Sequence, residues 1–110
     1  MLRTGSQRRK LCPKCPVARV VDMFGDPCSL LVMRDLLIRP RRFRDLEDSL
    51  GGTSPRTLAK ILRRLEKDGF VARKHFKKPV RFHYELTRKG RAFQKVVAAM
   101  RAYGKKYLRG

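Results

Sequence analysis

The sequence is poor in acidic residues and in long apolar runs, and it has no tryptophan. Its 110 residues include 9 Asp and Glu against 29 Lys and Arg, which gives a formal net charge of +20. Such an imbalance destabilises the compact state through self-repulsion, so we expect a polyanionic partner, with nucleic acid first and an anionic membrane surface second. No apolar run approaches the roughly 20 residues that cross a bilayer, and the basic N-terminus lacks the apolar stretch of a signal peptide. We therefore expect a cytoplasmic, nucleoid-associated protein with no membrane partner.

Cysteine is also sparse, with Cys12, Cys15 and Cys28 too few and too unevenly spaced for a secreted disulfide framework. The C-x-x-C pair of Cys12 and Cys15 could be half a zinc site, but no second pair follows. It could be a thioredoxin-type couple, but the preceding strand is missing. A third interpretation is a regulatory thiol, since nearby basic residues favour thiolate and Cys28 lies just inside a predicted helix N-terminus. Buried or spectator thiols are an equal alternative.

A catalytic constellation is absent from the sequence. The carboxylates lie singly, no phosphate-loop glycine pattern occurs, and no nucleophile is paired with a base. His75 and His83 have no further ligand at metal-binding spacing, so we interpret them as strand residues that make ordinary hydrogen bonds. We expect neither an enzyme nor a metal or cofactor site.

Composition divides the chain into a basic arm at residues 1–14 and one domain at residues 15–110. The arm is either a solvated tail or a segment that settles on phosphate groups. Helical spacing of apolar residues predicts a short helix over residues 16–24, ended by Gly25. Asp26 and Pro27 then predict the start of a second, central helix, which Arg39 and Pro40 end.

Residues 43–69 have the pattern of a helix-turn-helix. The segment 41–50 carries apolar residues on one helical face, and Gly51-Gly52 permits a sharp turn. Ser54 and Pro55 predict the start of a second helix, which runs to Asp68 before Gly69. Its apolar stripe is formed by Leu58, Ile61, Leu62 and Leu65.

The other face of the 54–68 helix is basic, as DNA recognition requires. Residues near the leading end of such a helix enter the major groove first, so we expect Arg56, Thr57 and Lys60 to contact base edges. A solvated basic face is the alternative, because Arg and Lys are good helix formers. The full predicted set is Ser54, Arg56, Thr57, Lys60, Arg63 and Arg64.

Residues 70–86 change to a period of two, which predicts a β-hairpin. Val80, Phe82, Tyr84 and Leu86 alternate with polar residues, so one face should be buried. A basic hairpin directly after a recognition helix is typical of a wing that contacts flanking DNA, although it could be only a solvated turn. The predicted contacts on the wing and its flank are Lys74, His75, Lys77, Lys78, Arg81 and Arg42.

A last long helix is predicted over residues 87–107, with Thr87 as its cap. Its apolar stripe has heptad-like spacing, which favours pairing with a second copy of the chain, although the helix could instead close the protomer's own core. A two-fold dimer through this helix and the first one would place two recognition helices about 34 Å apart on DNA. The predicted interface is Val17, Val20, Val21, Phe93, Val96, Val97, Met100, Tyr103 and Tyr107.

Several motifs in order resemble the HxlR family of winged helix-turn-helix regulators, within the MarR-like superfamily. They are Cys15-Pro16-Val17-Ala18-Arg19, residues 30–37 (LLVMRDLL), Pro40-Arg41-Arg42-Phe43, Ser54-Pro55-Arg56-Thr57-Leu58, residues 65–69 (LEKDG) and residues 84–90 (YELTRKG). The resemblance implies a dimeric transcription factor with terminal helices at the interface. It also implies an optional oxidant- or electrophile-sensing role for Cys15. The chain departs from the family at Pro27-Cys28, where Lys-Trp is common.

The fold expected is α+β and mainly α: a winged helix-turn-helix with a two-stranded wing and terminal dimerisation helices. The function expected is a dimeric, sequence-specific regulator of transcription that binds double-stranded DNA, with a small-molecule or oxidant effector as an open possibility. The alternative is an architectural protein that coats DNA without selecting a sequence, for which a net charge of +20 would suffice.

Overall fold

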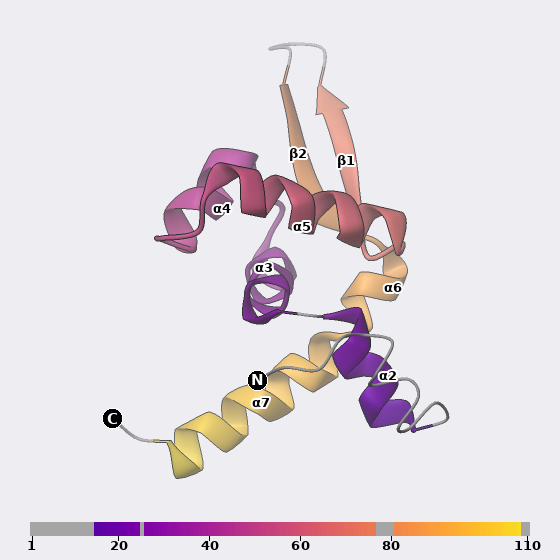
Figure 1. Ribbon diagram of the computed structural model, residues 1–110, viewed down its shortest axis with the longest axis vertical. Helices are drawn as coiled ribbons and strands as arrows, with labels where there is room; N and C mark the ends of the chain where they lie inside the picture. The colour runs from indigo at the N-terminus through magenta and orange to yellow at the C-terminus, as the bar shows by residue number, and fades with distance from the viewer. Residues whose placement is uncertain (1–14, 25, 77–80, 109–110) are drawn as a thin grey trace.

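The computed structural model describes residues 15–24, 26–76 and 81–108 (Figure 1). It confirms a mainly helical α+β fold with one two-stranded sheet. No helix in the described ranges is both long and apolar enough to cross a membrane. The basic arm at residues 1–14 lies outside these ranges. The elements are, in order, α2 (Pro16–Met23), α3 (Pro27–Ile38), α4 (Phe43–Ser49), α5 (Pro55–Lys67), β1 (Val71–Phe76), β2 (Arg81–Leu86), α6 (Arg88–Arg91) and α7 (Gln94–Tyr107).

Three helices begin at the predicted caps. The Asp26 carboxylate accepts the Ser29 N–H at 2.9 Å, and Pro27 occupies the first position of α3. Ser54 Oγ accepts the Thr57 N–H at 3.1 Å at the start of α5. Thr87 Oγ1 accepts from Gly90 at the start of α6. The predicted turns are also present, since Gly52 and Gly69 have φ values of 92° and 84°, which favour glycine.

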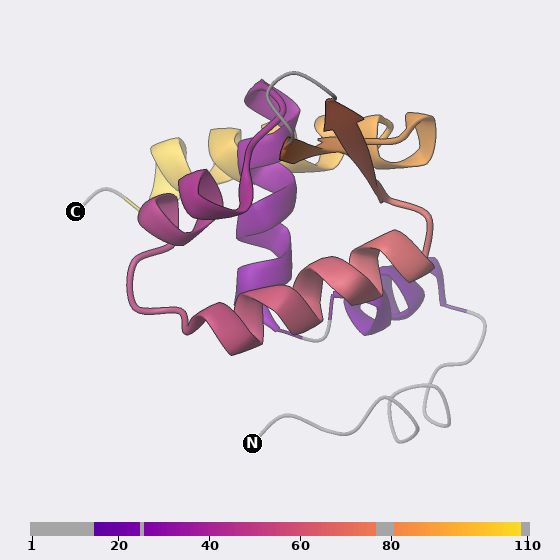
Figure 2. The same ribbon diagram turned by 90° about the horizontal axis from the view of Figure 1, so that it is seen from above.

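Helix α3 lies centrally, between α5 and α7 (Figures 1 and 2). Its Val32 and Met33 are fully buried, as are Leu58 and Leu65 of α5. Leu31, also on α3, is exposed. The core comprises Phe24, Val32, Met33, Leu36, Leu46, Leu50, Leu58, Ile61, Leu62, Leu65, Phe70, Val71, Tyr84, Leu86, Phe93 and Val97.

A buried carboxylate, which sequence reasoning missed, joins α3 to the end of α4. Asp35 is 4% exposed, and its oxygens lie 3.0 Å from Arg34 Nη2 and 2.5 Å from Ser49 Oγ, which donates to it. A buried charge is tolerated when it is paired and hydrogen-bonded in this way. Asp35 therefore fixes the first helix of the helix-turn-helix against the central helix.

The hairpin is antiparallel, with Val71 opposite Leu86 and Phe76 opposite Arg81. Tyr84 and Leu86 are buried and the intervening Glu85 is not, which confirms the predicted alternation at that end of β2. The helix-turn-helix begins at residue 43 as predicted, but the first two residues of the 41–50 segment are not helical. Helix α4 begins at Phe43, and Arg41 instead forms a β-bridge with Tyr84.

The predicted single helix over residues 87–107 is also wrong, because it divides into α6 and α7 at Ala92–Phe93. This division turns Phe93 and Val97 into the protomer's own core, where the Phe93 ring lies 4.8 Å from that of Phe24. The two residues are therefore withdrawn from the predicted dimer interface. Val20 is partly buried against the same core.

Candidate nucleic-acid interface

Helix α5 has one buried face and one basic face. Leu58, Ile61, Leu62 and Leu65 are buried against the core. Four leucine and isoleucine side chains at helical spacing fix this face, because each removes its apolar surface from water. The exposed positions are Pro55, Arg56, Thr57, Lys60, Arg63 and Lys67.

At the leading end of α5, the capping residues and the candidate DNA contacts overlap. Ser54 Oγ accepts the Thr57 N–H and donates to Thr57 Oγ1 at 2.9 Å. Ser54 is thus occupied within the cap, whereas Thr57 Oγ1 keeps its own proton for a DNA acceptor. Arg56 and Lys60 are exposed on the same part of the helix.

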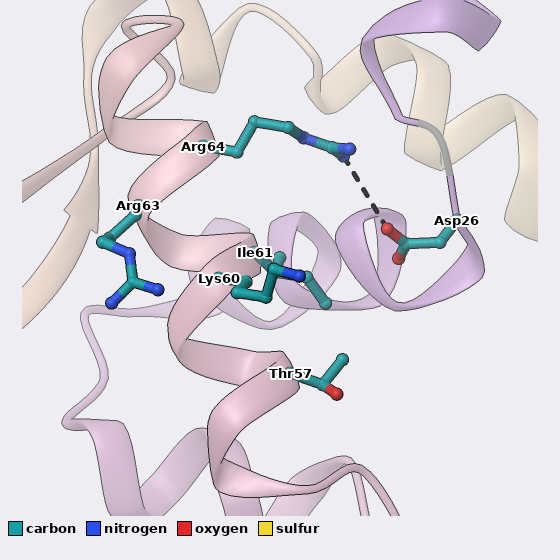
Figure 3. Close-up of a pocket in the computed structure, with 6 residues that line it drawn as sticks. All are labelled: Asp26, Thr57, Lys60, Ile61, Arg63 and Arg64. Carbon is teal, nitrogen blue, oxygen red and sulfur yellow. Dashed lines mark ion pairs between the residues drawn. The ribbon is translucent and has the colours of Figure 1, made fainter. Parts of the chain in front are cut away.

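A hollow of about 480 Å³ lies between α5 and the start of α3 (Figure 3). In this view Arg63 and Arg64 project to different sides of the helix, and Arg64 points to Asp26. The hollow combines a carboxylate with three cations and a hydroxyl. Its lining residues are Asp26, Thr57, Lys60, Ile61, Arg63 and Arg64.

Arg64 borders the same hollow as Thr57 and Lys60, but its guanidinium is bound within the protein. Its Nη2 donates to Ser29 Oγ at 2.8 Å and lies 3.8 Å from Asp26 Oδ2. Sequence position placed Arg64 at the edge of the basic face, but its partners belong to the N-terminal turn of α3. Its guanidinium therefore joins two helices of the protein.

The wing carries basic side chains that are partly paired within the protein. Arg73 Nε lies 3.2 Å from Glu66 Oε1 of α5, and Lys74 Nζ lies 3.8 Å from Glu85 Oε1. The basic partner of each pair, Arg73 or Lys74, is exposed to solvent, so each ion pair contributes little to stability. Each cation can therefore exchange its carboxylate partner for a phosphate. Of the predicted wing contacts, Lys74, His75 and Arg81 are exposed on the strands. Lys77 and Lys78 lie outside the described residues.

The histidines are strand residues. His83 Nε2 lies 3.3 Å from Glu85 Oε2, so Glu85 is a nearby carboxylate that the sequence analysis overlooked. The His75 ring packs at 5.6 Å from Phe82. Among the described residues, no three His, Cys, Asp or Glu side chains are arranged to hold a metal ion.

A second hollow, of about 330 Å³, lies between the start of α4 and β2. Arg42 and Arg81 were predicted as flanking contacts from separate parts of the sequence, and the bridge between Arg41 and Tyr84 brings them together. Sequence reasoning missed Arg44, which is also exposed here. The only signal for it was its place in the basic run around Arg42. The lining residues are Arg42, Phe43, Arg44, Glu47, Arg81 and Phe82.

Two of the three cysteines, Cys15 and Cys28, lie within the described residues, and both are partly buried. Cys15 is the N-cap residue of α2. Cys28 lies in the first turn of α3, with its Sγ 3.5 Å from Thr53 Oγ1 in the turn of the helix-turn-helix. The two are on different elements, and Cys12 lies outside the described residues.

Exposed apolar side chains gather on α2 and α7. Phe93, which precedes α7, and Val97 of α7 are buried in the core, and the exposed apolar side chains of α7 lie beside them. The Tyr103 and Tyr107 rings contact each other with centroids 4.8 Å apart and their planes tilted by 41°. The exposed members of the predicted interface are Val17, Val21, Val96, Met100, Tyr103 and Tyr107.

Comparison with known proteins agrees with this geometry. The sequence profile of HxlR-like helix-turn-helix proteins matches residues 23–110. The chain belongs to the HxlR-like helix-turn-helix family. The relatives of this chain are HTH-type transcriptional regulators. The chain is accordingly a DNA-binding transcription regulator of this family.

Two relatives and one further structure illustrate the match. The Synechocystis HTH-type transcriptional regulator sll1512 is 40% identical over 95 residues, which cover 86% of this chain and 70% of that protein. The Bacillus subtilis regulator YodB is 31% identical over 98 residues, 88% of this chain and 86% of YodB. The reduced form of YodB superposes with a TM-score of 0.73 at 29% identity, over 84% of this chain and 93% of that one. The PA1607 structure has a TM-score of 0.81 at 34% identity, over 93% of this chain and 70% of that one.

YodB has also been solved after diamide treatment and with a bound quinone. These structures have TM-scores of 0.67 and 0.71 against this chain, at 29% and 28% identity. They cover 84% and 87% of the chain, and 94% and 100% of the YodB chains.

Proposed function

We propose that the chain acts as a homodimer that selects its DNA sequence through α5 and holds flanking DNA through the wing. The observation that carries this proposal is the exposed basic face of α5 over a fully buried apolar face. Base edges in the major groove are recognised by Arg and by hydroxyl or ammonium donors at the leading end of such a helix. Arg56, Thr57 and Lys60 occupy that end.

The wing and the flank of α4 supply the contacts that do not read sequence. Lys74, Arg81, Arg42 and Arg44 are exposed and basic. Phosphate contacts from such residues fix register and orientation but carry no sequence information. A chain of net charge +20 should also bind random DNA strongly at low salt.

Dimerisation through α7 and α2 is supported by their exposed apolar side chains. Helix α7 lies on the opposite side of α3 from α5 (Figures 1 and 2). A two-fold interface on α7 therefore leaves the basic face of α5 open to DNA in both protomers. Phe93 and Val97 serve the protomer core, so the proposed seam is formed by Val96, Met100, Tyr103 and Tyr107.

A thiol signal is proposed to act through Cys15. This residue begins α2, which is part of the proposed dimer surface, so modification of its sulfur would alter the arrangement of the two protomers. The structures of YodB in reduced, diamide-treated and quinone-bound forms support a thiol or electrophile signal in this family. Cys28, in the first turn of α3 and 3.5 Å from Thr53 in the turn before α5, is the second candidate.

The proposal is tested by selecting bound duplexes from random DNA, with and without mild oxidant. A dimeric reader should recover an inverted repeat whose half-sites are about one helical turn apart. Oxidant should then change the affinity for that duplex in the wild type but not in Cys15→Ser. Recovery of unrelated sequences would contradict sequence reading, and an identical oxidant response in Cys15→Ser would remove Cys15 from the mechanism.

A further inference from the structure

Arg64 differs from its neighbours on α5 in the direction of its side chain. Arg63 is exposed on the outer face, whereas Arg64 extends to the N-terminal cap of α3 (Figure 3). Its Nη2 donates to Ser29 Oγ at 2.8 Å, and its Nε is buried. The guanidinium is therefore bound to the protein body through Nη2, although 38% of the side chain is exposed.

The acceptor of this hydrogen bond is itself fixed in place. Ser29 is fully buried, and its Oγ lies 3.3 Å from both carboxylate oxygens of Asp26. The same carboxylate accepts the Ser29 N–H at 2.9 Å as the cap of α3. Because Ser29 Oγ donates its proton to Asp26, its lone pairs are free to accept from Arg64. A charge-assisted bond to a fixed acceptor restrains α5 more than a pair between two flexible surface side chains would.

The opposite flank of α5 has a weaker, exposed ion pair with the wing. Glu66 Oε1 lies 3.2 Å from Arg73 Nε of β1. Residues 64 and 66 project about 200° apart around a helix, so the two polar contacts lie on opposite flanks of the apolar stripe. Apolar burial is non-directional and tolerates small rotations of a helix, whereas the directional hydrogen bond from Arg64 to Ser29 favours one rotation.

We propose that Arg64 is a positioning residue for base recognition. By binding the cap of α3, it sets the rotation of α5 about its axis, and hence the direction of Arg56, Thr57 and Lys60, without contacting DNA. This inference rests on the proposed recognition role of α5. Base readout needs geometry held to about 0.5 Å, so a small rotation of α5 is enough to weaken discrimination at several base positions together.

The test compares Ser29→Ala and Arg64→Gln with Arg63→Gln, a matched loss of one neighbouring cation. The affinity of each variant is measured for the selected duplex and for a random duplex over a series of salt concentrations. Ser29→Ala keeps every cation of α5 and the backbone cap of α3. We expect both Ser29→Ala and Arg64→Gln to lower the ratio of the two affinities about tenfold, the effect of one lost charge-assisted hydrogen bond. Arg63→Gln should lower the slope of log affinity against log salt by about 1, and Arg64→Gln should not.

The two losses should also share one cause, so the double variant should lose no more than either single one. A wild-type affinity ratio in Ser29→Ala would overturn the proposal. So would a fall in salt slope in Arg64→Gln equal to that in Arg63→Gln, since Arg64 would then be a phosphate contact. Thermal melting of each variant establishes that it is folded. Failure of the proposed function would be seen in the wild type itself, as equal affinity for the two duplexes, and would overturn this role of Arg64 as well.

Discussion

Arg41 and Tyr84 exchange two backbone hydrogen bonds: Arg41 N donates to Tyr84 O at 3.0 Å, and Tyr84 N donates to Arg41 O at 2.7 Å. This exchange is the close pair of an antiparallel ladder, so the segment between α3 and α4 adds to the edge of β2. The helix-turn-helix and the wing are consequently one unit. The Tyr84 side chain is buried at this junction.

The Tyr84 phenol should make stability depend on alkaline pH. Burial, together with the nearby Glu66, raises the pKa of Tyr84 above its ordinary value of 10.0, while Arg73 and Arg63 oppose this shift. A raised folded-state pKa means that the contribution of Tyr84 is complete below the unfolded pKa and is lost as pH rises through the folded one. The Tyr84→Phe variant has no phenol to ionise at this position. Above about pH 10 its free energy of unfolding should therefore fall less than that of the wild type. Urea unfolding of both proteins on either side of that pH measures the difference, and parallel pH profiles would contradict it.

Gly90 should not tolerate a side chain. A Cβ at this position would clash with the Phe70 carbonyl oxygen and would lie 3.1 Å from Leu86 Cδ2. Gly90→Ala should therefore destabilise the fold by about 1–3 kcal/mol through overpacking. Gly51→Ala is the control, because no atom lies within 4 Å of its added Cβ. Urea unfolding should leave Gly51→Ala near the wild type, and equal stability of the two variants would contradict the prediction.

Arg56 should contribute discrimination at one base position. The Arg56→Ala variant should lose about 1–3 kcal/mol of binding free energy for the duplex with the preferred base at that position. It should lose little for duplexes with another base there. Lys67→Ala removes the same charge from the other end of α5, where it should not alter base preference. Binding to the selected duplex and to its single-base variants gives the comparison. A uniform loss over all of these duplexes would make Arg56 a phosphate contact.

Met100 should be essential to the dimer. It is exposed on α7 within the proposed seam, so Met100→Glu would place a charge in an apolar interface and convert the dimer to a monomer. Gln94→Glu introduces the same charge at an exposed position about 120° around the helix from Met100 and should remain dimeric. Sedimentation at several concentrations gives the oligomeric state. A dimeric Met100→Glu would show that the protomers pair through another surface.

The sequence was sufficient to predict what depends on neighbouring residues. The caps at Asp26, Ser54 and Thr87 and the stripe from Leu58 to Leu65 each rest on contacts within a few positions, and all are present. The alternation of Tyr84 and Leu86 rests on a period of two in the same way.

Other features depend on partners that are distant in sequence. Arg64 lies at the edge of the basic face by its spacing, and only the position of Ser29, 35 residues away, shows that it turns inward. Val97 and Met100 belong to one broad apolar surface in sequence. Which part of it faces the core is decided by the division between α6 and α7 and by the Phe24 ring against Phe93.

The most direct test of sequence reading is competition between the duplex selected from random DNA and a random duplex of equal length, at physiological salt. Equal length and salt cancel most of the attraction due to the net charge of +20, so the ratio reports base discrimination. A regulator that reads sequence through α5 should bind its selected duplex at least about 10³-fold more tightly. Equal affinities would contradict this account and indicate a protein that coats DNA.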